Sequence, residues 1–257
     1  MTIVTLLSDY GIDNSTVGLL KGFILSAAPE TTLVDLTHQV PCQDLLVAQF
    51  ELGRAYRAFP KGTVHLAIVD PGISSKARPI AFQAGDYFFV GPDNGLFETV
   101  LEQEAIQAAI SLKPLPLPGM SGVFHGRDCY APAAAHLGLG KSLQDLGQAI
   151  DPQSLKRLEK HAQQESGHLV GWVQRIDPFG NLITNVPNAW VLAEESWRVR
   201  LPGHTLLFDP HKPDPEHKLQ VRPGNIGFME IAFEGESASE HLKVGTGCKV
   251  EFFKAKS

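Results

Sequence analysis

Residues 3–11 read IVTLLSDYG, a strand-length apolar run that ends in a polar segment and a glycine. Residues 15–28 follow with apolar side chains at helical spacing, and Pro29 then stops the helix. This stretch predicts a strand, a loop and a helix in succession, which is the building unit of α/β folds. A strand that ends next to glycine can turn sharply and present a polar side chain, here Asp9, above a rigid sheet.

The same alternation continues through the first 150 residues. Further strands are expected at residues 33–36, 64–69, 80–82 and 87–90, and further helices at residues 45–58, 95–102 and 131–139. Strands that alternate with helices favour a parallel sheet covered by helices. We therefore expect an N-terminal α/β domain with a mostly parallel sheet.

The composition changes at residues 155–167, where LKRLEKHAQQESG is polar and holds few bulky apolar side chains. Such a segment is typical of an exposed connector between domains. Beyond it, short strand-like runs separated by proline and glycine occupy residues 170–176, 197–201, 205–208, 228–233 and 249–253. The expected domains are 1–154 (α/β), a linker at 155–167, and an all-β barrel or sandwich at 168–257.

Composition and charge exclude several classes of protein. Hydrophobic residues make up 43% of the chain and charged residues 19%, which indicates a folded protein. The net charge of -6 offers no basic footprint for nucleic acid, and no apolar run is long enough to span a membrane. Cys42, Cys129 and Cys248 lie far apart without a CxxC pair, so neither a disulfide framework nor a thiolate zinc site is expected. The cytoplasm is the expected compartment.

Known cofactor motifs are missing from the sequence. It has no GxGxxG, no Walker A lysine motif and no GxSxG elbow, and its ten histidines lack the HExxH spacing of a zinc site. We therefore expect neither a metal nor a cofactor.

Three polar clusters punctuated by glycine are candidates for the functional site. They are VDPG at 69–72, FHGRD at 124–128 and DPFGN at 177–181, and each follows an apolar run. Together they are typical of an active site built on strand ends, although any one of them could be a plain turn.

Seven segments in order resemble one family. LSDYG (7–11), KG (21–22), DLTH (35–38), VDPG (69–72), VGPDNG (90–95), FHGRD (124–128) and DPFGNLITN (177–185) together look like the S-adenosylmethionine hydrolases, also called SAM hydroxide adenosyltransferases. These are relatives of the fluorinase and chlorinase enzymes. The resemblance implies an α/β domain followed by a barrel-like β domain, and a homotrimer with its sites between subunits.

The resemblance also implies a reaction. Water would attack C5′ of S-adenosyl-L-methionine and release adenosine and L-methionine, and Asp70 and His125 match the positions that hold this water. A sulfonium leaves as a neutral thioether, so catalysis consists of orienting the nucleophile and removing competing solvation. A carboxylate and an imidazole can share the water's proton near neutral pH.

The family's catalytic arginine is missing from its usual position. After Asp-Pro-Gly the family carries two adjacent arginines, whereas here Ala77 takes the place of the first and only Arg78 is retained. Arg78, or else Lys76, would have to supply the positive charge, and Arg78 is the favoured substitute. The two cations are not equivalent where planar, two-pronged contacts are needed.

Matched positions also imply the substrate contacts. Asp9 would grip the ribose diol, Asp177 the ammonium group and Asn181 an edge of the adenine. The other matched residues are Phe179, stacked near the purine; Asn225, at the methionine carboxylate; and Gly235, whose backbone would meet the adenine.

Four further residues of these motifs have mainly structural interpretations. Asp93 and Asn94 either shape the site or form a plain turn. Arg127 and Asp128 are expected to form a local ion pair that orients the loop of His125.

Other functions remain open at this point. Halogenating relatives usually carry Tyr at position 70 and a halide-binding Ser at position 126, whereas this chain has Asp70 and Gly126. A carboxylate would repel halide and bind water, so hydrolysis is favoured over halogenation. A non-catalytic protein that binds adenosyl compounds would not need Asp70 and His125. A nucleoside hydrolase would want more acids near the N-terminus than Asp9 and Asp13.

Overall fold

The computed structural model describes residues 2–70, 76–114, 124–165, 167–192, 196–210 and 218–255. Pro71 and Gly72 of the first polar cluster lie outside the described residues. The chain forms two compact units, Met1–Leu158 and Glu159–Ser257.

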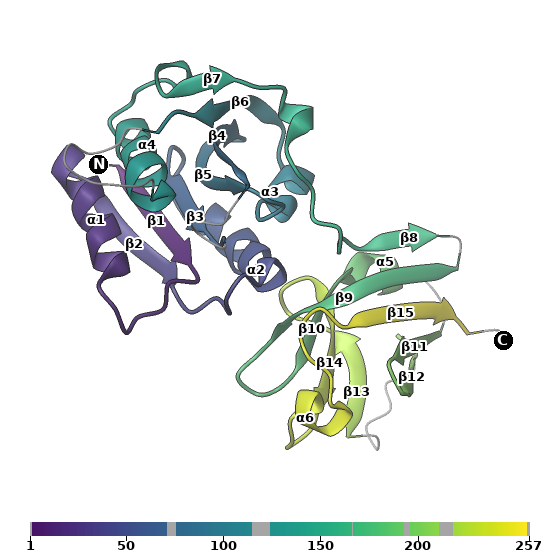
Figure 1. Ribbon diagram of the computed structural model, residues 1–257. Coiled ribbons are helices and arrows are strands. Elements are labelled where there is room, and N and C mark those ends of the chain that lie inside the picture. Colours follow the sequence, from purple (N-terminus) through teal and green to yellow (C-terminus); the bar gives the residue numbers. More distant parts are fainter. Residues whose placement is uncertain are drawn as a thin grey trace. The chain divides into compact units, whose positions relative to one another are not determined.

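The N-terminal unit is built on a seven-stranded sheet with the order β2-β1-β3-β5-β4-β6-β7 (Figure 1). Its strands are β1 (Ile3–Ser8), β2 (Thr32–Thr37), β3 (Val64–Ile68), β4 (Arg78–Ala84), β5 (Tyr87–Asp93), β6 (Ile106–Leu112) and β7 (Gly147–Ala149). The four strands from β2 to β5 in this order pair in parallel, and the pairings from β5 onward to β7 are antiparallel.

The sheet is therefore mixed, and not mostly parallel as the alternation of elements predicted. The reason lies in the connection between β4 and β5, which consists of Gly85 and Asp86 alone, since Ala84 pairs with Tyr87. A two-residue connection joins only antiparallel strands, because a parallel pair needs a crossover of a dozen or more residues. Gly85 supplies the positive φ of +54° that this tight turn requires.

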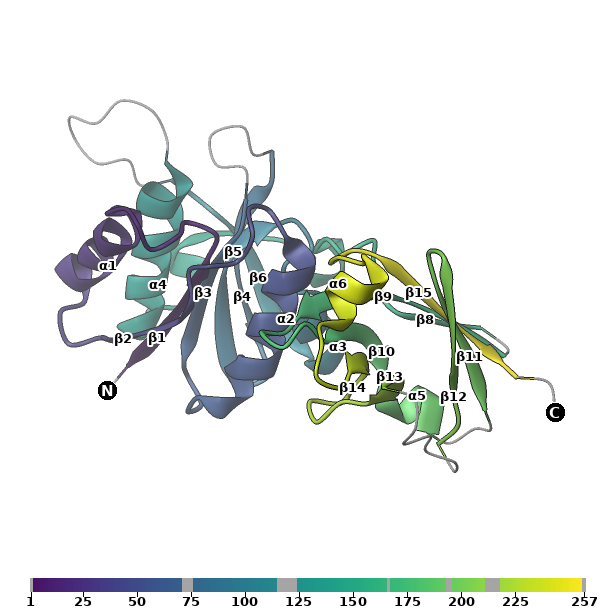
Figure 2. The same cartoon turned by 90° about the horizontal axis from the view of Figure 1, so that it is seen from below.

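Helices cover both faces of this sheet (Figures 1 and 2). Helices α1 (Thr16–Ala27) and α4 (Ala131–Gly138) pack on one face around Leu20 and Ile24, and α2 (Leu45–Ala55) and α3 (Glu98–Gln103) pack on the other. Shorter turns of helix are η1 (Tyr56–Ala58), η3 (Gly126–Tyr130), η4 (Leu143–Asp145) and η5 (Pro152–Ser154). The sheet is thus buried between two apolar layers, which holds its strand ends rigidly.

The C-terminal unit is one antiparallel sheet with the path β12-β11-β15-β9-β10-β14-β13, to which β8 adds beside β9. Its strands are β8 (Gln163–Glu165), β9 (His168–Ile176), β10 (Leu182–Pro187), β11 (Trp197–Leu201), β12 (His204–Phe208), β13 (Leu219–Pro223), β14 (Phe228–Phe233) and β15 (Lys249–Lys254). The end strands β12 and β13 also lie against each other, so the sheet nearly closes into a barrel. Two short helices, α5 (Asn188–Leu192) and α6 (Ala238–Leu242), were not predicted.

Candidate active site

The carboxyl ends of β1 and β3 border the position at which open α/β sheets have their ligand-binding crevice, and we call this position the crevice. From β1 the chain passes to β2 on one side and later to β3 on the other side of β1, so the strand order reverses there. Ser8 is aligned with Ile68 in the parallel pair, and Asp9 and Asp70 follow directly beyond these strand ends. Ligands of open α/β sheets bind at such a switch point.

Asp9 and Asp70 interact electrostatically in this crevice. Burial raises the pKa of Asp9, and the negative charge of Asp70 raises it further, whereas backbone hydrogen bonds, including those of Gln43 and Asp70, lower it. The Gln43 N–H donates to Oδ2 of Asp9 at 3.0 Å. The two carboxylates make this crevice acidic, which suits a cationic ligand.

The loop that carries His125 is held by the predicted ion pair, which the structure confirms. Arg127 Nε donates to Oδ1 of Asp128 at 2.6 Å and Arg127 Nη2 donates to Oδ2 at 2.8 Å. Asp128 is fully buried, and its Oδ2 also accepts the N–H of Phe124 at 2.8 Å. Because the bonds span both sides of His125, they fix its backbone.

His125 and Asp70 lie near the same tyrosine. η3 is a π-helical turn, in which residues five apart fall one above the other, and the ring centroids of His125 and Tyr130 are 6.0 Å apart. Burial raises the pKa of Tyr130, and the charge of Asp70 is the next largest cause. Tyr130 therefore lies beside His125 and within electrostatic range of Asp70.

Gly126, next to His125, is tightly packed against two aromatic side chains. A Cβ at this buried position would lie 3.0 Å from the ring of Phe124 and 3.1 Å from the hydroxyl of Tyr10. A serine at position 126 would therefore displace one of these rings.

Arg78 lies at the start of β4 and is held in place by a neighbouring strand. Its Nε and Nη2 donate to Oδ2 of Asp93 at 3.2 and 2.7 Å, and Nη2 also reaches the carbonyl and hydroxyl of Ser154. Asp93 is buried and accepts the N–H of Lys156 as well. These contacts give Arg78 a structural role at the strand end, whereas the side chain of Lys76 is exposed.

Asn94 connects two strand ends at the site. Its Nδ2 donates to the carbonyl of Val69 at 2.9 Å, and its Oδ1 accepts the N–H of Leu96. Asn94 thus fixes the residue that precedes Asp70, which favours the site-shaping interpretation of this loop.

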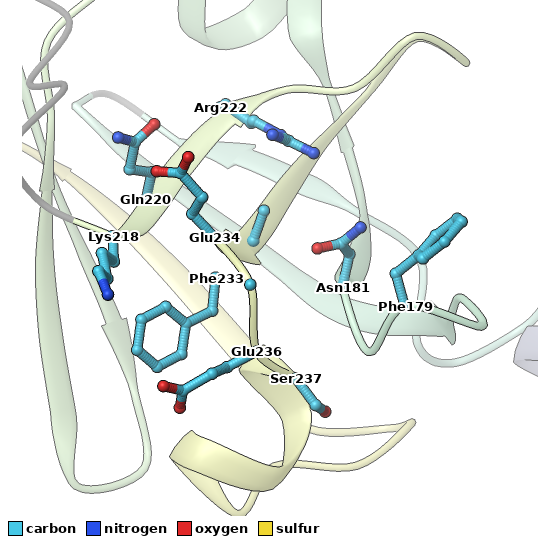
Figure 3. Close-up of a pocket in the computed structure, with 11 residues that line it drawn as sticks. Phe179, Asn181, Lys218, Gln220, Arg222, Phe233, Glu234, Glu236 and Ser237 are labelled. Atoms are coloured by element: carbon cyan, nitrogen blue, oxygen red, sulfur yellow. The ribbon is translucent and has the colours of Figure 1, made fainter.

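Three of the expected substrate contacts line one cavity of about 640 Å³ in the C-terminal unit (Figure 3). They are Phe179, Asn181 and Gly235, and the wall also carries the charged residues Lys218, Arg222, Glu234 and Glu236. Phe179 is 79% exposed, so its ring is available to a ligand. A cavity with an aromatic face and several polar groups suits a nucleoside-like molecule.

Asp177 and Asn225, the two further contacts expected in this unit, are placed differently. Oδ1 of Asp177 accepts the N–H groups of Phe179 and Asn181, and Oδ2 accepts the side-chain amide of Asn181. Asp177 therefore holds the β9–β10 turn in shape and orients Asn181. Asn225 is exposed in the turn between β13 and β14 and is not among the residues that line this cavity.

Some residues around the site were missed by sequence reasoning. Burial raises the pKa of both Tyr10 and Tyr130, and the charge of Asp70 raises both further. Ser8 is fixed by His38, whose Nδ1 lies 2.7 Å from its hydroxyl and whose Nε2 lies 3.0 Å from Asp35. The signal that could have revealed this network was the DLTH motif, which had no assigned role.

Two classes of accessory group can be checked against the geometry. Among the described ranges, no cluster of three or more His, Cys, Asp or Glu side chains could hold a metal ion. Within the same ranges, no helix combines the length and the hydropathy that a membrane crossing requires.

The fold and the crevice define a two-domain α/β–β protein with an acidic site at the switch point of its first sheet. Residues 4–147 match the N-terminal domain of the SAM hydroxide adenosyltransferases and residues 171–251 match their C-terminal domain. The chain belongs to the SAM hydroxide adenosyltransferase family.

Relatives of known name agree with this membership. The chain is 36% identical to an (R)-S-adenosyl-L-methionine hydrolase of Thermus thermophilus, over 97% of this chain and 99% of the relative. It is 37% identical to a hydrolase of the same name from Salinispora tropica, over 95% of both chains. A fluorinase of Nocardia brasiliensis is 29% identical over 72% of this chain and 71% of its own.

Solved structures share the fold. A conserved protein of Thermotoga maritima superimposes with a TM-score of 0.82 at 30% identity, over 99% of this chain and 100% of that one. A conserved protein of Thermus thermophilus gives a TM-score of 0.79 at 32% identity, over 98% and 100% of the two chains.

Proposed function

We propose that this chain hydrolyses S-adenosyl-L-methionine to adenosine and L-methionine. The observation that carries the proposal is the pair of carboxylates, Asp9 and Asp70, at the switch-point crevice of a member of this family. S-adenosylmethionine is a sulfonium cation, and an acidic crevice attracts it.

In the proposed reaction, Asp70 and His125 hold one water in line with the C5′–S bond. The water oxygen forms a bond to C5′ as the C5′–S bond breaks, and the bonding pair leaves with the sulfur as a neutral thioether. The proton lost by the water passes to the carboxylate or the imidazole and then to solvent. Asp9 binds the ribose hydroxyls, which places C5′ next to the water.

In this proposal Arg78, the favoured substitute for the family's catalytic arginine, acts as a positioning residue through its ion pair with Asp93. Because Arg78 is bound to Asp93, it stabilises the strand ends beside Asp70. An Arg78→Lys variant keeps the charge but loses the two-pronged contact, so a fall in turnover with unchanged folding would support this role.

Halogenation is the weaker candidate. A halide at the water position would meet the charge of Asp70, and the serine of halogenating relatives would require Tyr10 or Phe124 to shift slightly at Gly126. The test is incubation of the protein with S-adenosylmethionine, with and without fluoride or chloride, followed by chromatography. Adenosine and methionine in every sample support hydrolysis, and a 5′-halogenated nucleoside would contradict it.

We further propose a homotrimer in which each site combines the N-terminal unit of one subunit with the C-terminal unit of its neighbour. The support is the family membership and the division of the candidate groups, with Asp70 and His125 in one unit and Phe179 and Asn181 in the other. Light scattering tests the mass. Co-expression of Asp70→Asn and Asn181→Ala chains tests the shared site, because mixed trimers would regain sites with no altered residue.

We also propose that the protein resides in the cytoplasm. Cys42 is an exposed free thiol, and Cys129 and Cys248 are also unpaired, as expected in a reducing compartment.

A further inference from the structure

One buried hydroxyl beside the proposed catalytic pair has no hydrogen-bond partner among the described residues. It belongs to Tyr130, whose side chain is only 1% exposed. An unsatisfied phenol in a packed interior is unfavourable, and native structures keep such groups mainly where water or a ligand completes the bonding.

The groups around this hydroxyl indicate what could form a hydrogen bond with it. Tyr130 lies one π-helical turn after His125, with the ring centroids 6.0 Å apart at an angle of 60°. Burial raises the pKa of Tyr130, and the charge of Asp70 adds to this, so its hydroxyl remains protonated at neutral pH and is a hydrogen-bond donor. The hydroxyl is thus a donor that lies near a carboxylate and an imidazole.

The rings of Tyr10 and Phe124 lie against each other next to Gly126. Their ring centroids are 6.2 Å apart, and the hydroxyl of Tyr10 lies 3.1 Å from the Cβ position of Gly126. Among the described residues, the rings of Tyr10, Phe124 and Tyr130 thus make this neighbourhood partly aromatic.

We propose that Tyr130 is a catalytic residue whose hydroxyl donates a hydrogen bond to the nucleophilic water held by Asp70 and His125. A water forms four tetrahedral hydrogen bonds: its two protons point to the carboxylate and the imidazole, and one lone pair accepts from Tyr130. Three fixed directions leave the fourth, the remaining lone pair, aimed at C5′. Tyr130 thereby converts a bound water into an oriented nucleophile.

The inference rests on the proposed function, because it needs the water of Asp70 and His125. The main variant is Tyr130→Phe, which removes only the hydroxyl and leaves no partner unsatisfied among the described residues. The matched control is Tyr87→Phe, whose hydroxyl donates to the carbonyl of Phe59 at 3.2 Å in the same unit. Both variants should keep cooperative thermal unfolding.

The expected result is a loss of about tenfold or more in kcat for Tyr130→Phe with KM for S-adenosylmethionine within about twofold, and little change for Tyr87→Phe. A double variant Asp70→Asn/Tyr130→Phe should be about as slow as Asp70→Asn alone, because both residues hold one water. Should the Phe variant fold poorly, 3-fluorotyrosine at position 130 keeps the hydroxyl and should retain the rate within about threefold.

The outcomes separate the two claims. Full kcat in Tyr130→Phe together with an inactive Asp70→Asn would overturn the role of Tyr130 and leave the proposed site standing. Multiplicative losses in the double variant would also overturn it, since Tyr130 would then act apart from the water. Full activity of Asp70→Asn would instead remove the proposed site.

Discussion

The charge of Asp70 adds to burial in raising the pKa of Asp9, so the two carboxylates share one crevice at the ends of β1 and β3. A raised pKa means that the folded protein holds the ionised form of Asp9 at a cost. Below the unfolded pKa of about 3.8 that cost is absent, and it appears as the pH rises through the folded pKa. The ionised form of Asp9 therefore lowers the stability of the folded protein at neutral pH.

Asp9→Asn should raise the midpoint of thermal unfolding at pH 7 and raise KM for S-adenosylmethionine about tenfold or more, because the substituted amide removes the charge but grips the ribose diol poorly. Calorimetry and initial rates measure the two effects. Asp145→Asn serves as the control, since Asp145 forms an exposed capping box with Ser142 at η4, beside the strands at the other edge of the sheet. A lower midpoint of thermal unfolding for Asp9→Asn would show that the ionised Asp9 side chain does not destabilise the folded protein.

Arg127→Met should lower the midpoint of thermal unfolding by about 5 °C or more and also lower kcat, because it leaves the buried carboxylate of Asp128 without its cation and loosens the loop of His125. Lys61→Met is the matched control, since the Lys61–Asp86 pair is exposed on both sides. Equal effects of the two variants would mean that the ion pair does not hold this loop.

The core of the N-terminal unit predicts a pH dependence of stability. His65 is fully buried among Tyr56, Tyr87 and Phe89, and burial lowers its pKa to about 3. The pKa of His65 in the unfolded chain is about 6.5. Between about pH 3 and pH 6.5 the unfolded chain therefore binds a proton at His65 that the folded chain does not bind. Stability should fall as the pH drops from about 6.5 toward 3.

A double variant tests this assignment. His65 bonds the hydroxyl of Thr5 at 2.7 Å, so Thr5→Val/His65→Phe removes both partners and leaves none unsatisfied. Urea unfolding at a series of pH values should give a flatter profile for this variant than for the parent. An unchanged slope would show that other groups cause the acid sensitivity.

Phe179→Ala should raise KM for S-adenosylmethionine several-fold and leave stability unchanged, because the ring is 79% exposed at the C-terminal cavity. Leu207→Ala provides the control, since Leu207 is 76% exposed in the same unit and does not line that cavity. If both variants keep the parental KM, stacking of Phe179 on the purine is wrong.

The sequence predicted the helices and strands whose apolar residues are strongly periodic. It did not predict the direction in which neighbouring strands pair. The strand before Asp9, helix α1 and most strands of the second unit were predicted because their apolar spacing survives in the fold. The antiparallel half of the first sheet was not, although the two residues between β4 and β5 required it. Strand β6 was overlooked because its alanines weaken the apolar signal.

The sequence suggested residue types for the candidate site but not the contacts that these residues form. Polar residues beyond the ends of β1 and β3 led us to propose Asp9 and Asp70, since such positions carry function in α/β sheets, whereas His125 lies directly before η3. The roles of Asp177 and Arg78 were obscured because a sequence does not show which hydrogen bonds a side chain has already formed within its own turn or strand. Tyr130 needed the π-helical turn, whose five-residue spacing has no sequence signature.

The central claim is attack of water on C5′, and hydrolysis in H₂¹⁸O with mass spectrometry of both products tests it most directly. We expect one ¹⁸O in the 5′-hydroxyl of adenosine and none in methionine. The Asp70→Asn variant should form no labelled adenosine, although calorimetry should show that it still binds S-adenosylmethionine. Methylthioadenosine with ¹⁸O in homoserine, or labelled adenosine at full rate from Asp70→Asn, would contradict it.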